Sequence, residues 1–216
     1  MLQKLSVALL SAACFAFATV GAAQADTLTF DELGSPAPVD DLTVKGVTFD
    51  FKIDGVDSTD ATYNLSLPPE LPSNLFGNLQ QPLLEGNATG ILTLDFAQPT
   101  STLEFAVGVE ALGDVTSALN VELFDTELNS QGIIPVNTSS QVALSEALFA
   151  YSGVPVQRAV LDFDRTKLGL DPTIDPRFSL DNLNYTAEVP EPSAFVGLLV
   201  LGALGGGLRH SRKQKA

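Results

Sequence analysis

Carboxylates are the most abundant side chains in this sequence that could do chemistry. The 216 residues include 26 Asp and Glu, 11 Lys and Arg, one Cys and one His, and that histidine is His210, near the C-terminus. The remainder of the chain therefore cannot assemble Ser-His-Asp or Cys-His catalysis, or a zinc or iron site held by histidine. Two carboxylates could in principle serve a glycosidase, but no pair stands out among so many.

One group of aspartates surrounds a glycine. Its members are Asp50, Asp54, Asp57 and Asp60, and Gly55 lies among them. The spacing lacks the Asp-x-Asp-x-Asp-Gly order of an EF-hand calcium loop. We therefore expect this stretch to be a solvent-exposed turn.

The charge is concentrated in the middle of the chain, over residues 26–188. Glu191 is the one acidic residue outside this body, and Lys4 and four tail cations are the basic residues outside it, which leaves 25 acidic and 6 basic residues and a net charge of −19. Nucleic acids and anionic membranes would repel such a body, so no nucleic-acid partner is expected. Divalent cations, and matrix polymers bridged by them, remain candidate partners. Alternatively, the charge only keeps an exported domain soluble.

Residues 1–25 have the composition of a secretory signal peptide. A basic residue near the start precedes an apolar stretch, and Ala23 and Ala25 are the small residues that signal peptidase needs for cleavage before Asp26. Cys14 could instead be lipidated, although the large aliphatic residue expected three positions earlier is absent. If the signal is removed, Cys14 leaves with it, and the exported chain has neither a thiol nor a disulfide.

Residues 189–216 are predicted to enter the membrane. The motif Val189-Pro190-Glu191-Pro192 precedes an uncharged, apolar run over residues 193–208. As a helix this run would span about 24 Å, somewhat less than a hydrocarbon core of about 30 Å. A basic tail follows over residues 209–216, and its cations predict a cytoplasmic C-terminus. These cations are Arg209, Arg212, Lys213 and Lys215. The alternative is a short buried helix at the end of a soluble domain.

The order of motif, apolar run and basic tail resembles the PEP-CTERM sorting signal of Gram-negative bacteria, also called the ice-binding protein C-terminal domain. The Pro190-Glu191-Pro192 match is complete, and its spacing to the run and the tail fits. The resemblance implies that an exosortase, a membrane-embedded cysteine protease-transpeptidase, cleaves near the motif. The body would be held in the inner membrane and then pass to the cell surface or extracellular matrix. Alternatively, the tail is a permanent anchor.

The body is predicted to be one all-β domain, an antiparallel β-sandwich resembling a jelly roll. Short runs alternate apolar and polar residues, most clearly over residues 102–109 and 119–125. About ten short strands in one domain favour two packed antiparallel sheets. The predicted strands cover residues 27–33, 42–51, 61–67, 90–96, 102–110, 118–125, 132–136, 141–151, 156–164 and 177–188. Residues 141–150 could instead form a short helix, and residues 68–86 lack strand character.

The two ends of the body resemble those of jelly-roll carbohydrate-binding modules. The likeness is carried by Leu28-Thr29-Phe30-Asp31-Glu32-Leu33 and by residues 178–185. In such modules the first and last strands lie side by side and often share a structural calcium. The resemblance therefore implies Asp31, Glu32 and Asp181 as calcium ligands, with a backbone carbonyl nearby. The alternative is that these carboxylates are ordinary solvent-facing groups at strand ends.

The sequence as a whole predicts a secreted, non-enzymatic structural or adhesive protein of the cell surface or extracellular matrix. The first alternative is a carbohydrate-binding module for exopolysaccharide, which an exposed aromatic pair on one sheet face would support. Such platforms are scarce, because the chain has no Trp and 3 Tyr. The second alternative is a secreted hydrolase, which two carboxylates facing each other across a cleft would support.

Overall fold

The computed structural model of the chain describes residues 24–66 and 76–187. Contacts group Gln24–Glu188 into one compact unit. Most of the signal peptide and the whole sorting signal, including the motif at 189–192, the apolar run and the basic tail, lie outside the described residues. Within the described part, none of the helices has the length and apolar character to cross a membrane.

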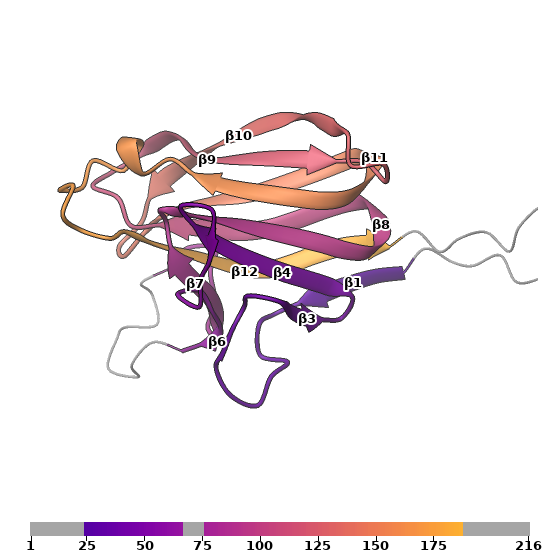
Figure 1. The fold of residues 1–216 in the computed structure, drawn as a ribbon. Coiled ribbons are helices and arrows are strands. Elements are labelled where there is room, and N and C mark those ends of the chain that lie inside the picture. The colour runs from indigo at the N-terminus through magenta and orange to yellow at the C-terminus, as the bar shows by residue number, and fades with distance from the viewer. Residues whose placement is uncertain (1–23, 67–75, 188–216) are drawn as a thin grey trace, which may run out of the picture. The chain divides into compact units, whose positions relative to one another are not determined.

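The described body is an antiparallel β-sandwich, as predicted (Figure 1). Its strands are β1 (Gln24–Leu28), β2 (Ala37–Pro38), β3 (Leu42–Val44), β4 (Val47–Ile53), β5 (Val56–Asp57), β6 (Thr62–Leu65), β7 (Leu83–Asn87), β8 (Gly90–Val109), β9 (Val115–Phe124), β10 (Ser130–Ser140), β11 (Ser145–Phe163) and β12 (Arg177–Ala187). A short 3₁₀ helix, η2 (Arg165–Lys167), follows β11.

Two long strands belong to both layers of the sandwich. The first half of β8 pairs with β4 and its second half pairs with β12. The first half of β11 pairs with the second half of β8, and the second half of β11 lies between β8 and β9. Layer A therefore contains β3, β4, β5, the first half of β8, the second half of β11, β9 and β10. Layer B contains the other halves of β8 and β11 together with β1, β12, β7, β6 and β2.

Both long strands change layer next to a proline. Pro99 lies in β8 and Pro155 in β11, and the pairing of the two strands is irregular between Ser152 and Arg158. Proline has no backbone N–H for the ladder, which favours a bend at this point. The prediction of separate strands at 90–96 and 102–110, and at 141–151 and 156–164, was wrong in this respect. Each pair forms one continuous, bent strand.

Tight turns lie at both ends of β4, and the first of them divides the region predicted as a single strand over residues 42–51. Lys45 and Gly46 have φ angles of 46° and 79° and join β3 to β4. Asp54 and Gly55 have φ angles of 53° and 77° and join β4 to β5. Positive φ at both central positions is typical of the two-residue turns of twisted hairpins. The predicted turn around Gly55 is therefore confirmed.

Further boundaries differ from the prediction. Residues 83–86 were expected to lack strand character but belong to β7, whose side chains alternate between two covered faces. The helical alternative for residues 141–150 is wrong, because β11 begins at Ser145. The first strand ends at Leu28 rather than residue 33.

Aromatic side chains from the two layers meet in the core. Phe178 of β12 stacks on Phe163 of β11 with ring centroids 4.2 Å apart, and Phe51 of β4 lies 6.0 Å from Phe178. Tyr63 of β6 contacts Phe49 of β4 edge-on at 5.9 Å. All five rings are buried, and burying each large apolar side chain contributes roughly 1.5–3 kcal/mol. This packing fixes which side chains of layer A face outward.

Candidate functional site

The outer side of layer A carries a regular array of side chains, which we call the open face. Along each of its four central strands, alternate residues point into the core and the others point outward. None of the outward residues is buried. The open face consists of Thr48, Asp50 and Lys52 on β4; Ile91, Thr93 and Asp95 on β8; Arg158, Val160 and Asp162 on β11; and Asn120, Glu122 and Phe124 on β9.

Strand register arranges these residues in three rows across the layer. The first row runs from Thr48 through Asp95 and Arg158 to Phe124. The second row runs Asp50, Thr93, Val160, Glu122, and the third runs Lys52, Ile91, Asp162, Asn120. Neighbouring strands lie about 4.8 Å apart, so each row places a hydrogen-bonding or apolar group at short, regular intervals.

One row is organised by a paired arginine. The Arg158 guanidinium donates through Nε at 2.6 Å and through Nη2 at 3.0 Å to the two oxygens of Asp95. Bidentate pairs of this kind are the stronger ion pairs. The hydrogen bonds to Asp95 raise the pKa of Arg158, so the guanidinium stays charged. Phe124 of β9 is the next residue in this row.

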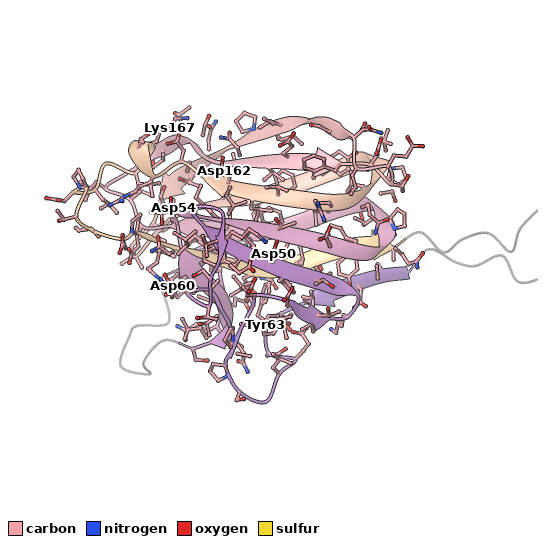
Figure 2. All side chains as sticks on the ribbon, viewed as in Figure 1. Asp50, Asp54, Asp60, Tyr63, Asp162 and Lys167 are labelled. Carbon is pink, nitrogen blue, oxygen red and sulfur yellow. The ribbon has the colours of Figure 1, made fainter. Side chains whose placement is uncertain are left out.

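The other two carboxylates of the open face, Asp162 and Glu122, form no ion pair within the described residues. Asp162, labelled with Asp50 in Figure 2, is exposed, and partial desolvation together with the Asp164 charge raises the pKa of its carboxyl group. Its cross-strand neighbours are Ile91, which is 41 % exposed, and Asn120. Glu122 accepts a hydrogen bond of 2.6 Å from Ser130 Oγ. A carboxylate, an amide and an apolar side chain therefore lie next to one another in the third row.

The open face has an acidic group at its β4 edge, formed by Asp40, Asp50 and Asp57. Carboxylate oxygens from the three residues lie within 4.8 Å of one another. The Lys52 ammonium lies 2.6 Å from Asp50 Oδ2 and 3.0 Å from Asp57 Oδ1. The hydrogen bonds that the Lys52 ammonium donates to Asp50 and Asp57 raise the pKa of Lys52. A lysine cation therefore already pairs with two of the three carboxylates of this cluster.

The four aspartates around Gly55 do not share a single partner. Asp50 and Asp57 pair with Lys52, whereas Asp60 accepts from Arg177 Nη1 at 2.9 Å. Asp54 occupies the turn itself. The sequence cluster is therefore not one site.

The first and last strands lie side by side, as the resemblance to carbohydrate-binding modules implied. β1 pairs antiparallel with β12, and Gln24 lies opposite Ala187. Two residues of the predicted signal cleavage site, Ala25 and Asp26, belong to β1 and lie opposite Thr186 and Tyr185, while Ala23 lies outside the described residues. The chain therefore enters and leaves the described body at one end (Figure 1).

The three carboxylates predicted as calcium ligands occupy one region but have protein partners. Glu32 accepts from Tyr63 Oη at 2.5 Å and Lys45 Nζ at 3.1 Å. Asp181 accepts from the backbone N–H of Gln80 at 2.8 Å. Asp31 accepts from a neighbouring threonine and raises the pKa of Asp181 through its charge. Among the described residues, these three are not a group whose oxygens converge within 4.8 Å, so calcium binding stays a prediction.

Aromatic side chains do not form the exposed pair that would have supported sugar stacking. Over residues 24–66 and 76–187, the Phe and Tyr side chains are buried or half-buried. Phe124 on the open face is half-buried, and Tyr151 uses its hydroxyl to donate to the Val154 carbonyl at 2.7 Å. Any ligand of the open face would therefore be held mainly by hydrogen bonds.

Sequence reasoning missed the open face as a unit. The alternation over 91–95, 120–124 and 158–162 indicates which residues point outward. It does not indicate that these strands are neighbours, because Arg158 and Asp95 are 63 residues apart.

No protein-family model matches the chain, and no curated protein matches it. The solved structures similar to this chain include carbohydrate-binding modules of family 29. A mutant of CBM29-2 is 12 % identical, covers 78 % of this chain and 93 % of its own, and superposes with a TM-score of 0.39. A second family 29 mutant has 11 % identity, coverages of 79 % and 100 %, and a TM-score of 0.39. A family 29 module from Piromyces equi is 10 % identical, covers 76 % of this chain and 92 % of its own, and superposes with a TM-score of 0.38. Similarity at this level assigns neither a family nor a ligand to this chain.

Proposed function

We propose that the chain is an exported, non-catalytic β-sandwich module that holds a neutral polysaccharide of the cell surface or extracellular matrix against its open face. The observation that carries the proposal is the three-row array on layer A. Sugar hydroxyls both donate and accept hydrogen bonds, so they suit a surface on which carboxylates, an amide and a guanidinium alternate. Val160 and Ile91, on the two middle strands of the array, offer apolar contact to sugar C–H groups.

Charge favours a neutral polymer over an acidic one. The open face has four carboxylates and two cations, and both cations are already paired with aspartates. The surrounding body carries the net charge of −19 described above, which would repel an anionic polysaccharide at low salt. Without an exposed aromatic platform, we expect weak binding by one module and stronger retention where many copies face one polymer.

Delivery to the surface is part of the same proposal. The tail at residues 189–216 would pass the body to an exosortase after signal peptidase cleaves before Asp26. The pairing of β1 with β12 supports this arrangement, because attachment through the C-terminus leaves the strands of layer A free along their length. The body would then act as an adhesive or structural component that contacts exopolysaccharide.

Affinity electrophoresis tests the ligand. The full chain in mild detergent is run through gels that contain neutral glucans, neutral mannans or an acidic polysaccharide. We expect a neutral polymer to retard the chain. The double variant Asn120→Ala, Asp162→Ala should lose most of this retardation, because it removes the adjacent acceptors and donor of the third row.

Glu104→Ala provides the matched control, since Glu104 is an exposed carboxylate on the layer B half of β8. It should migrate like the unmodified chain. Retardation by none of the neutral polymers would exclude polysaccharide binding of this kind. Retardation that the open-face variant and the control reduce equally would show that the ligand binds elsewhere.

A further inference from the structure

A short segment covers the outer side of layer B, and we call it the strap. It comprises residues 76–82, which precede β7. Leu79 packs with Ala106 and Leu83 in a buried apolar cluster that is separate from the main core, and the half-buried Phe76 and Leu144 flank it. The strap lies so close to β8 that a Cβ atom at Gly108 would come within 2.8 Å of Leu79 and Leu144.

Two buried carboxylates hold the strap through its backbone. Glu146 of β11 accepts from the Gly77 N–H at 3.0 Å and from the Asn78 N–H at 2.6 Å. Asp181 of β12 accepts from the Gln80 N–H at 2.8 Å. Glu146 is 3 % exposed and Asp181 is 1 % exposed. The strap amides therefore replace much of the water that would otherwise solvate these two side chains.

The neighbourhood of Asp181 is unusually unfavourable for a negative charge. In the described part of the chain, neither Asp181 nor Glu146 forms an ion pair with Lys or Arg. The charged groups that approach Asp181 are Asp31 and Glu32, and Glu104 lies on the same side of β8. Burial is the largest influence and raises the pKa of Asp181. Hydrogen bonds from the Gln80 and Asn182 backbone N–H groups lower the pKa in part, the charges of Asp31 and Glu32 raise it again, and the result is a pKa of about 6.

We propose that the strap is an acid-tightened clamp: it closes more firmly over layer B when Asp181 takes up a proton, and it opens more readily when Asp181 is ionised. Asn182 can accommodate both states. Its side-chain amide donates to Asp181 Oδ2 at 2.8 Å, and a flip of this amide would present an oxygen to a protonated carboxyl group.

Proton linkage determines how opening of the strap depends on pH. When the strap lifts, Asp181 meets water and its pKa returns toward the ordinary value of 3.8. The closed state therefore binds more protons than the open state between these two pKa values. The opening equilibrium therefore increases as the pH rises from 3.8 to about 6, and it levels off above that range. From pH 5 to pH 8 the opening equilibrium should increase about tenfold.

Hydrogen exchange of the full chain in detergent tests the clamp. The amides to follow are those of Gly77, Asn78 and Gln80, with protection corrected for intrinsic exchange at each pH. We expect their protection to fall about tenfold between pH 5 and pH 8. Asp181→Asn keeps an acceptor for Gln80 but cannot ionise, so its strap should show the same protection at both pH values.

Asp162→Asn is the matched control, because it removes an exposed carboxylate from layer A and should keep the tenfold change. The amides of Leu94 and Val121 in layer A report unfolding of the whole domain. Equal strap protection at pH 5 and pH 8 in the unmodified chain would overturn the proposal. A tenfold fall in protection that persists in Asp181→Asn would also overturn it. If the protection of the Leu94 and Val121 amides fell between pH 5 and pH 8 by the same factor as that of the strap, this would also overturn the proposal. This comparison needs only the unmodified chain.

Discussion

The hydroxyl of Tyr63 donates a 2.5 Å hydrogen bond to the carboxylate of Glu32, a residue 31 positions away. Tyr63 is completely buried on β6, and Glu32 lies in the segment after β1. Lys45 in the β3–β4 turn also donates to Glu32, and its backbone carbonyl accepts from Tyr185 of β12. One carboxylate thus joins β6 and the β3–β4 turn to the segment that follows the N-terminal strand.

Tyr63→Phe should destabilise the domain by about 1.5–3 kcal/mol, the usual range for a hydrogen bond to a charged group. The variant keeps the buried ring but removes a donor from Glu32, which retains the Thr29 N–H and Lys45. Urea unfolding measures the change. Tyr151→Phe is the control and should lose less than about 1 kcal/mol, because its hydroxyl bonds to a neutral carbonyl at the surface. Equal losses would contradict the importance assigned to Glu32.

Glu32 should also contribute to the acid limb of stability. Burial acts to raise its pKa, but hydrogen bonds from Tyr63, Thr29 and Lys45 outweigh burial and hold the pKa below 4.5. Its contribution is therefore complete above pH 4.5 and is lost as the pH falls through the lower, folded-state pKa. The stability difference between the unmodified chain and Glu32→Gln should shrink between pH 6 and pH 3. A difference that stays constant would be inconsistent with this role.

Phe178→Ala should cost about 3–5 kcal/mol, because it removes a ring that contacts both layers and leaves a cavity. Phe178 stacks on Phe163 and also contacts Phe51. Thermal and urea unfolding measure the loss. Phe124→Ala, on the half-buried open face, should cost much less. Comparable losses at the two positions would mean that layer packing does not centre on Phe178.

Gly108→Val should loosen the strap at every pH. The added side chain would meet Leu79 and Leu144, whose terminal methyl groups must move. Protection of the Gly77 and Asn78 amides should fall several-fold, while Leu94 keeps its protection. Gly113→Val is the control, because no atom lies within 4 Å of a Cβ at Gly113. Unchanged strap protection in Gly108→Val would argue against close contact between the strap and β8.

The intact mass of protein recovered from the envelope and culture medium tests both processing steps. A chain that starts at Asp26 and ends near Pro190 would agree with cleavage by signal peptidase and an exosortase, and added mass would identify the acceptor group. A mass that includes everything to Ala216 would exclude cleavage of the tail and favour a permanent anchor.

Local patterns predicted the strands better than their continuity. Alternation over residues 90–96 and 102–110 located both halves of β8, but the intervening Gln98-Pro99 favoured a break. The break is a bend, because Thr100 keeps its pairing with Val156 across the junction. β7 was missed because Glu85, Gly86 and Asn87 have low strand propensity, which burial between β6 and β12 overrides.

The candidate site, like the fold, could be predicted from the sequence only in part. Composition indicated a surface rich in carboxylates, and the outward positions can be read from each strand. The pairing of Asp95 with Arg158 and the capture of the Gln80 amide by Asp181, a residue 101 positions away, have no local signature.

The sequence by itself determined the all-β class, the inward and outward residues of most strands and the acidic composition, and it predicts the export and sorting signals. These depend on composition and on a period of two residues, which are properties of a single segment. Only the tertiary structure decided that β8 and β11 join two layers, which residues share the open face, and that the strap lies against buried carboxylates. Those relationships depend on register and packing between segments far apart in the chain, where each partner supplies half of the interaction.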